Sequence, residues 1–159
     1  MALPGIKKDG TLYICATPQD SDLNKAAFEA LTWVEIDKIV TMPDMGRTDN
    51  MVSQDYVNTT VSQWQKGFAN AGQSELVIGR DHEDAGQDAL RVAAATRYNY
   101  AFKLESSDAP SASFTNTIRY SRGIISGPML SGGGGEDFDN ETYNIGFNQV
   151  PVIVDPEAI

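Results

Sequence analysis

Acidic residues surround the single histidine of the sequence, and together they could bind a metal. His82 lies in RDHEDAG, next to Asp81, Glu83 and Asp84. Residues that are adjacent on one short loop converge poorly on an ion, and no second histidine can complete a site. Acidic side chains immediately before a helix are what the helix dipole favours. We therefore interpret the cluster as the beginning of a helix.

The segment GGGGEDFDNETYN suggests a phosphate loop or a calcium loop. No Gly-Lys-Ser/Thr follows the glycines, so the phosphate-loop pattern is incomplete. Asp137, Asp139 and Glu141 alternate like calcium ligands, but Thr142 and Asn148 occupy the positions of the glycine and the terminal glutamate of that motif. We expect a flexible, solvated connection between two strands, and calcium binding remains the alternative.

Glu35 and Asp37 are a pair of carboxylates that could serve acid–base catalysis. They are equally typical of the solvent face of a strand. No GxSxG motif is present, and nothing near Cys15 would activate it as a nucleophile. Arg119 and Arg122 come closest to a basic cluster, without the aromatic residues typical of nucleic-acid readout. We expect neither an enzyme nor a cofactor.

Length and composition indicate one globular domain over residues 1–159, with 41% hydrophobic and 21% charged residues. The net charge of −10 opposes attraction to nucleic-acid phosphates and to anionic membranes. One cysteine permits no internal disulfide, and neither a signal peptide nor a membrane-length apolar run is visible. These features predict maturation in the cytoplasm without membrane association.

Alternating apolar residues predict mostly strands, and one segment has clear helical periodicity. That helix is predicted over residues 84–97, with Asp84 as its N-cap and Leu90, Ala93, Ala94 and Arg97 on one face. A shorter helix begins at Ser21 or Asp22. Strands are expected at residues 11–17, 32–40, 72–81, 99–106, 113–127 (bent at Gly123) and 142–148. An arm at 1–11, a long loop at 41–63 and an arm at 150–159 complete the chain.

The predicted fold is mainly β (α+β), an antiparallel β-sandwich or curved sheet flanked by one α-helix. The strands do not alternate regularly with helices, which argues against a parallel doubly wound sheet.

The order of these elements resembles a known family. Its most specific parts are WVEIDKIVTMPDMG, GFANAGQSELVIGRDHEDAGQDAL and YNYAFKLE. Over residues 12–154 the chain resembles the major tail tube protein of long, non-contractile-tailed bacteriophages, a family also similar to contractile-tail and type VI secretion tubes. The resemblance implies that six copies form a ring, that strands of all copies join one continuous inner barrel with the helix outside, and that rings stack into a tube.

The resemblance also implies roles for individual residues. The long loop would reach the neighbouring ring, which makes Met42, Met45, Met51, Tyr56 and Trp64 candidate inter-ring contacts. The alternative is that these side chains fold back on their own domain.

DNA passing through a tube should not bind its wall, so lumen-facing acids are expected. The candidates are Glu35, Asp37, Glu75 and Glu105. A lumen lined by Lys38, Lys103 or Arg119 would contradict this assignment.

The sequence thus predicts a structural tail subunit of the virion, assembled in the host cytoplasm, with no catalytic activity. Its expected partners are copies of itself and the tail terminator, tail tip and tape measure proteins, while DNA transits the lumen without specific binding. The alternatives are a tail terminator or secretion-tube ring protein, and a monomeric calcium-dependent β-sandwich binding module.

Overall fold

A computed structural model describes residues 10–159. Residues 1–9 of the predicted N-terminal arm lie outside the described residues, and Gly10 and Thr11 already belong to the first strand. No helix in the described part is long and apolar enough to cross a membrane.

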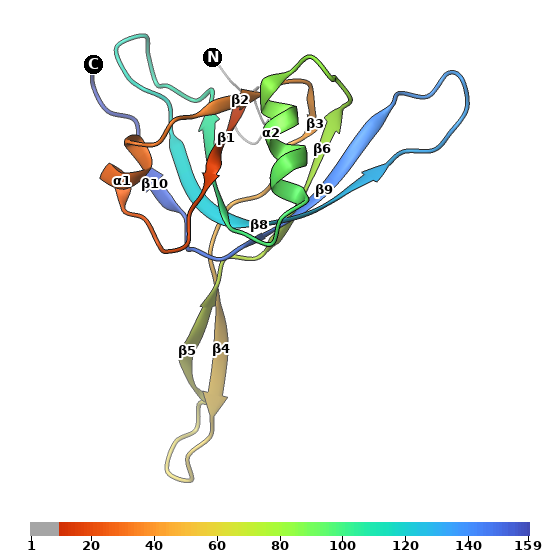
Figure 1. Cartoon of the computed structure of the whole chain (residues 1–159). Coiled ribbons are helices and arrows are strands. Elements are labelled where there is room, and N and C mark those ends of the chain that lie inside the picture. The colour runs from red at the N-terminus through yellow and green to blue at the C-terminus, as the bar shows by residue number, and fades with distance from the viewer. Residues whose placement is uncertain (1–9) are drawn as a thin grey trace.

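One curved antiparallel sheet forms the body of the molecule (Figure 1). Its strand order is β2-β1-β7-β8-β9-β6-β3, and β10 pairs with β8 beside the end of β9. The strands are β1 (Gly10–Pro18), β2 (Val34–Ile36), β3 (Ile39–Thr41), β6 (Gln73–Gly79), β7 (Tyr100–Ser106), β8 (Ile118–Leu130), β9 (Asn140–Phe147) and β10 (Val152–Val154). The predicted mainly β, antiparallel fold with a curved sheet is confirmed.

The two outermost strands of this sheet, β2 and β3, are consecutive in the chain. Only Asp37 and Lys38 separate them, and Lys38 turns the chain with a positive φ of 56°. The sheet must therefore curve until its first and last strands approach each other. No ladder joins β2 to β3 in the described part, so the barrel stays open. The single strand predicted for residues 32–40 is wrong, because residue alternation cannot reveal this turn.

Helix α2 (Ala85–Ala94) lies in the hollow of the curved sheet (Figure 1). Asp84 caps it as predicted, because its carboxylate accepts a hydrogen bond from the Gln87 amide. Leu90 and Ala93 are fully buried against the sheet. The helix ends before Arg97, which was predicted to belong to it. The main core of the protein lies between α2 and the sheet and includes Leu12, Ile14, Leu76, Ile78, Phe102, Tyr143 and Ile145.

A second, smaller cluster covers the opposite face of β1, β7 and β8. Phe28 and Tyr120 stack there with ring centroids 5.1 Å apart, next to Cys15 and Ala101. Phe28 comes from the short helix α1 (Lys25–Glu29). Its N-cap is Asn24 rather than Ser21 or Asp22, since the Asn24 side chain accepts from the Ala27 amide.

The irregularity of β8 lies further along than expected. Gly123 keeps regular pairing with Tyr100 and Phe147, and a Cβ there would lie 2.6 Å from the Gly146 carbonyl oxygen. Close approach of the strands, rather than a bulge, therefore requires this glycine. The register shifts between Ser126 and Met129 instead.

The C-terminal segment, predicted as an arm over residues 150–159, contacts the body. It includes β10, and Ala158 forms a bridge with Phe114.

Candidate assembly surface

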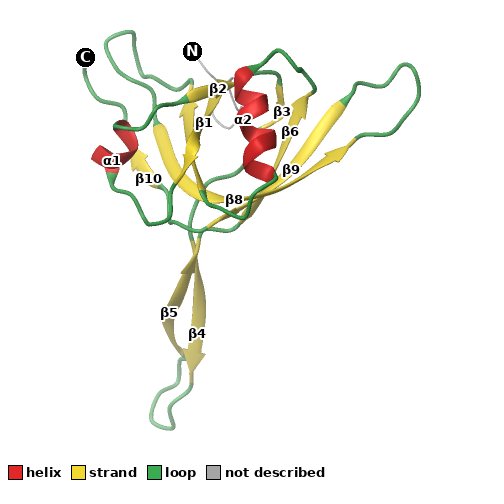
Figure 2. Cartoon of the chain, in the orientation of Figure 1, coloured by secondary structure: helices red, strands yellow, loops and turns green. Residues whose placement is uncertain are grey.

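A β-hairpin projects from the body where a loop was predicted. Within residues 10–159, strands β4 (Thr48–Gln54) and β5 (Gln63–Asn70) pair only with each other, as a separate two-stranded sheet (Figures 1 and 2). The loop expected over residues 41–63 is thus corrected to a hairpin that extends to Asn70. Residues 55–62 connect its strands without a short turn signature, so the sequence pattern concealed the pairing.

The hairpin exposes apolar side chains on both faces. Every residue of β5 is exposed, including Trp64 at 61% and Phe68 at 92%. The exposed apolar residues between 48 and 70 are Met51, Val52, Tyr56, Val57, Val61, Trp64 and Phe68. An isolated two-stranded hairpin is marginally stable in water, and exposed apolar patches mark interaction surfaces. The hairpin is therefore a segment that a partner would stabilise.

Strand pairing divides these side chains between two faces. Met51 lies opposite Lys66, and Ser53 lies opposite Trp64, so all four share what we call the Trp64 face. Val52 lies opposite Gln65 on the other face. Lys66 Nζ is 3.8 Å from an Asp49 carboxylate oxygen, which also places Asp49 on the Trp64 face.

Charge is balanced within this segment, although the chain as a whole carries −10. Residues 47–70 contain two basic residues, Arg47 and Lys66, and two acidic residues, Asp49 and Asp55. A hydrogen bond from Arg47 holds the pKa of Asp49 below its usual value, and the positive charges of Arg47 and Lys66 lower it further. The hairpin can therefore approach another copy of this acidic chain with little repulsion.

Two of the five predicted contact residues belong to the body instead. Met45 is only 7% exposed and lies in the main core, and Met42 is half-buried against that core. The Asp44 amide donates to the Ser74 hydroxyl of β6, which holds this segment on the sheet. Met45 is thus wrong as a surface contact, and the fold-back alternative applies to it and to Met42. Met51, Tyr56 and Trp64 remain exposed on the hairpin.

Three of the four predicted lumen acids share one face of the main sheet. Strand register places Glu35 and Glu105 on the face opposite α2, which we call the outer face. Glu75 lies on the same face, because it alternates with the core residue Leu76. Lys103 also lies on the outer face, with its Nζ 4.6 Å from the centre of the Tyr13 ring.

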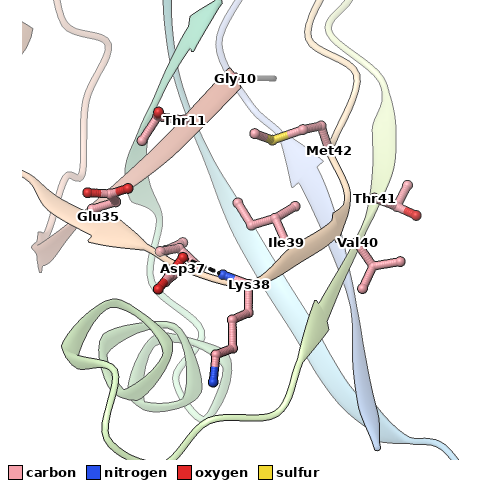
Figure 3. Close-up of a pocket in the computed structure, with 10 residues that line it drawn as sticks. Gly10, Thr11, Glu35, Asp37, Lys38, Ile39, Val40, Thr41 and Met42 are labelled. Atoms are coloured by element: carbon pink, nitrogen blue, oxygen red, sulfur yellow. Dashed lines mark hydrogen bonds between the residues drawn. The ribbon is translucent and has the colours of Figure 1, made fainter. Parts of the chain in front are cut away.

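Asp37, the fourth acid, lies at the gap between β2 and β3. This gap forms an open pocket of about 570 Å³ (Figure 3). Asp37 accepts a hydrogen bond from the Lys38 amide, while Lys38 Nζ reaches Asp81 at 3.0 Å. The Glu83 amide and Lys38 hold the pKa of Asp81 below its usual value. The charged groups here stabilise the turn.

The predicted calcium ligands are not brought together. Glu141 is only 2% exposed and pairs with Arg91, while Asp139 pairs with Arg80 and Asp137 accepts from the Gly134 amide. Within residues 10–159, no group of three or more His, Cys, Asp or Glu side chains is placed to hold a metal. His82 lies exposed in the turn before α2.

Sequence reasoning missed the polar side chains that fasten α2 into the sheet. The fully buried Gln87 donates to the Asp37 carbonyl at 3.0 Å and to the Gly79 carbonyl at 2.8 Å. It thereby joins the β2–β3 turn to the end of β6. Arg91, one turn later, reaches Glu141 on β9 at 3.2 Å. Gln87 and Arg91 are four residues apart and therefore lie on one face of the helix. This spacing was the sequence signal that could have indicated their shared role.

Comparison with known proteins identifies the fold. No family model matches the sequence, and no curated protein matches it either. Among solved structures, a chain of the anti-feeding prophage baseplate, a six-fold symmetrised assembly, matches with a TM-score of 0.65 at 10% identity, over 98% of both chains. The fold is that of a prophage baseplate chain. A type six secretion system protein is also similar, with a TM-score of 0.49 at 15% identity over 93% of both chains.

Proposed function

We propose that the protein is a structural subunit of a bacteriophage tail tube, which polymerises as stacked hexameric rings around a channel for DNA. In this proposal hairpin β4–β5 reaches into the adjacent ring. The chain acts without catalysis or cofactor, in the virion tail, after assembly in the host cytoplasm. Its partners are further copies of itself and the tail terminator, tail tip and tape measure proteins.

The observation that carries this proposal is the free-standing hairpin. Its exposed Met51, Tyr56 and Trp64 are residue types enriched in interfaces, and neither of its faces is covered by the described part of the body. A monomer leaves these apolar side chains in water, whereas a stacked polymer would bury them. The likeness in fold to a chain of a six-fold baseplate supports a ring-forming subunit.

The sheet face opposite α2, called the outer face above, would line the channel of the proposed tube. Its charges support a role in conducting DNA. Glu35, Glu75 and Glu105 lie on the side of the sheet away from α2, as a lumen wall with α2 outside would require, and α1 with its hydrophobic cluster covers part of this side over β1, β7 and β8. Six copies would multiply these charges around the channel. Carboxylates repel phosphates over a range of about 8–10 Å in physiological salt. Lys103 lies on the same face and counts against a wholly acidic wall, so the proposed repulsion rests on Glu35, Glu75 and Glu105.

A second candidate is a ring at the end of a tube rather than a tube subunit. The likeness to a baseplate chain favours this variant specifically. A tail terminator or a secretion-tube ring would belong to the same class. These variants predict discrete rings that do not stack into long tubes.

Electron microscopy of the purified protein across a concentration series tests the proposal. The matched variant lacks residues 48–70, with a Gly-Gly link in their place, because Thr48 and Asn70 are directly paired and the chain ends lie close together. This deletion leaves Met45 in the core. We expect tubes from the full chain, and a folded variant that does not stack.

Single rings from the full chain would favour the terminator or baseplate variant. Monomers at every concentration, combined with calcium-dependent ligand binding, would overturn the proposal in favour of the binding module.

A further inference from the structure

A second projection of the molecule exposes apolar side chains as well. We call residues 129–139, at the far end of the β8–β9 hairpin, the β8–β9 tip (Figure 1). Met129 is 73% exposed, Leu130 51% and Phe138 87%. The tip contains Glu136, Asp137 and Asp139 and no basic residue. The tip thus exposes apolar side chains beside acidic ones, of which Asp139 is paired with Arg80.

The glycines of the tip are not all explained by packing within the chain. A Cβ added at Gly132 or Gly135 would meet nothing within 4 Å, and neither residue has a positive φ. Gly133, in contrast, has a φ of +131° and requires its glycine. Glycine without an internal steric reason permits close approach of another surface to the backbone. The tip is therefore suited to receive a partner.

The Trp64 face of hairpin β4–β5 complements this tip. Trp64 and Met51 offer an aromatic ring and a flexible thioether, which pack well against side chains such as Phe138. Lys66 and Arg47 share the single carboxylate of Asp49, which leaves one positive charge in excess on this face. An apolar surface with a basic edge thus matches an apolar surface with an acidic edge.

The two projections cannot meet within one molecule. In Figure 1 the hairpin extends downward from the body, while the tip extends away at the upper right. A contact between them must therefore join two copies. Because it uses different surfaces on each copy, it is heterologous, and such contacts generate rings or open filaments.

We infer that the β8–β9 tip of one copy docks on the Trp64 face of the hairpin of another copy. Phe138 and Met129 then pack against Trp64 and Met51, and Glu136 lies near Lys66. This inference rests on the proposed function, since it names the surface that receives the hairpin.

Charge reversal tests the pairing. We expect Lys66→Glu or Glu136→Lys alone to raise the concentration needed for assembly by about tenfold, the effect of a typical interface residue. The double variant should recover most of this loss, because the charges again oppose each other. Glu83→Lys, an equal charge change at an exposed turn residue, is the matched control and should leave assembly unchanged. Absence of recovery in the double variant would contradict the inference.

Cysteine cross-linking gives a second readout that leaves the apolar residues intact. Copies with Ser53→Cys, opposite Trp64, are mixed with copies carrying Gly135→Cys and oxidised during assembly. The native Cys15 is buried and remains silent. We expect a cross-linked pair of the two variants. Gln65→Cys, on the other hairpin face, replaces Ser53→Cys as the matched control and should cross-link far less.

The outcomes separate the inference from the proposed function. Tubes or rings that form without the Ser53–Gly135 cross-link would overturn the docking and leave the proposed function standing. Failure of the full chain to assemble at any concentration would overturn the docking, and together with calcium-dependent ligand binding it would overturn the proposed function as well.

Discussion

Glu141 is a carboxylate that the fold holds almost entirely out of water, at 2% exposure. It accepts hydrogen bonds from Arg91 Nε at 3.2 Å and from the Tyr143 hydroxyl at 2.7 Å, and Arg80 Nε lies 3.4 Å away. A buried charge is tolerated only when paired in this way. This side chain connects β9 to α2.

Replacing Glu141 should therefore destabilise the protein strongly. We expect Glu141→Ala to lower the free energy of unfolding by about 3 kcal/mol, because Arg91 loses its buried partner. The matched control is Asp88→Ala, which removes an exposed carboxylate that contacts the same guanidinium at 2.8 Å. This variant should lose less than about 1 kcal/mol. Urea unfolding of the hairpin-deleted chain measures both values, and equal losses would contradict the assignment.

Because of Tyr143, the free energy of unfolding should depend on pH in the alkaline range. Burial raises the pKa of its hydroxyl above the usual value, and the hydrogen bond to Glu141 raises it further. Above about pH 10 the unfolded tyrosine loses its proton while the folded one keeps it. The folded state then binds more protons, so stability falls as pH rises, by up to about 1.4 kcal/mol per pH unit.

Tyr143→Phe should remove this contribution. We expect the variant to lose stability less steeply than the parent chain above about pH 10, as measured by urea midpoints across the alkaline range. Tyr13 and Tyr120 also have raised pKa values, caused mainly by burial, so a residual slope is expected. Parallel curves for the variant and the parent would show that Tyr143 titrates normally.

At the scale of elements, α2 lies on β2 closely enough to exclude a side chain. A Cβ at Gly86 would lie 1.9 Å from the Glu35 carbonyl oxygen, which is backbone and cannot move aside cheaply. The same contact allows Gln87 to reach the carbonyl groups of Asp37 and Gly79. The first turn of α2 therefore holds the open edges of the sheet near each other.

Gly86→Ala tests this close packing. We expect a loss of about 3 kcal/mol or more in the free energy of unfolding, because the helix must shift away from β2. Gly46→Ala is the matched control, since a Cβ there would meet nothing within 4 Å and its φ is not positive. It should change stability by less than about 0.5 kcal/mol. A tolerated Gly86→Ala would mean that the helix can lie further from the sheet.

At the scale of the whole molecule, the acidic charge lies on the body and the β8–β9 tip, while the hairpin segment is neutral. In the proposed tube, this distribution would keep free copies apart through mutual repulsion and leave the hairpin able to make contact. The proposed docking would also restrict exposed side chains of the hairpin and the tip, and this entropic cost would oppose premature assembly.

The outer face provides the test of DNA passage. Glu75→Lys changes an exposed acid there, and Glu83→Lys makes an equal change in the turn before α2. We expect assembled Glu75→Lys rings to retain DNA in low salt and to release it as salt rises, because added positive charge attracts phosphates. Assembled Glu83→Lys rings should behave like the parent. Equal retention by both variants would place Glu75 outside the channel.

Local patterns in the sequence determined most strands of the main sheet, the α2 helix with its Asp84 cap and the mainly antiparallel class, but not the hairpin strands β4 and β5 or the break between β2 and β3. These features depend on alternation, periodicity and capping, which involve residues close together in the chain. They also limited the candidate catalytic and metal-binding sites, because the sequence has one histidine and its lysines and arginines are scattered.

The tertiary structure alone decided which apolar residues face water. Met45 and Met51 are the same residue type six positions apart, yet one lies in the core and the other is exposed on the hairpin. Lys38, with its positive φ, lies between β2 and β3, which take opposite ends of the strand order. Glu141 is buried beside Arg80 and Arg91, which are distant from it in the sequence. Contacts between distant segments decide which side chains are buried, how the strands pair and which hairpins project from the body. No local periodicity encodes those contacts.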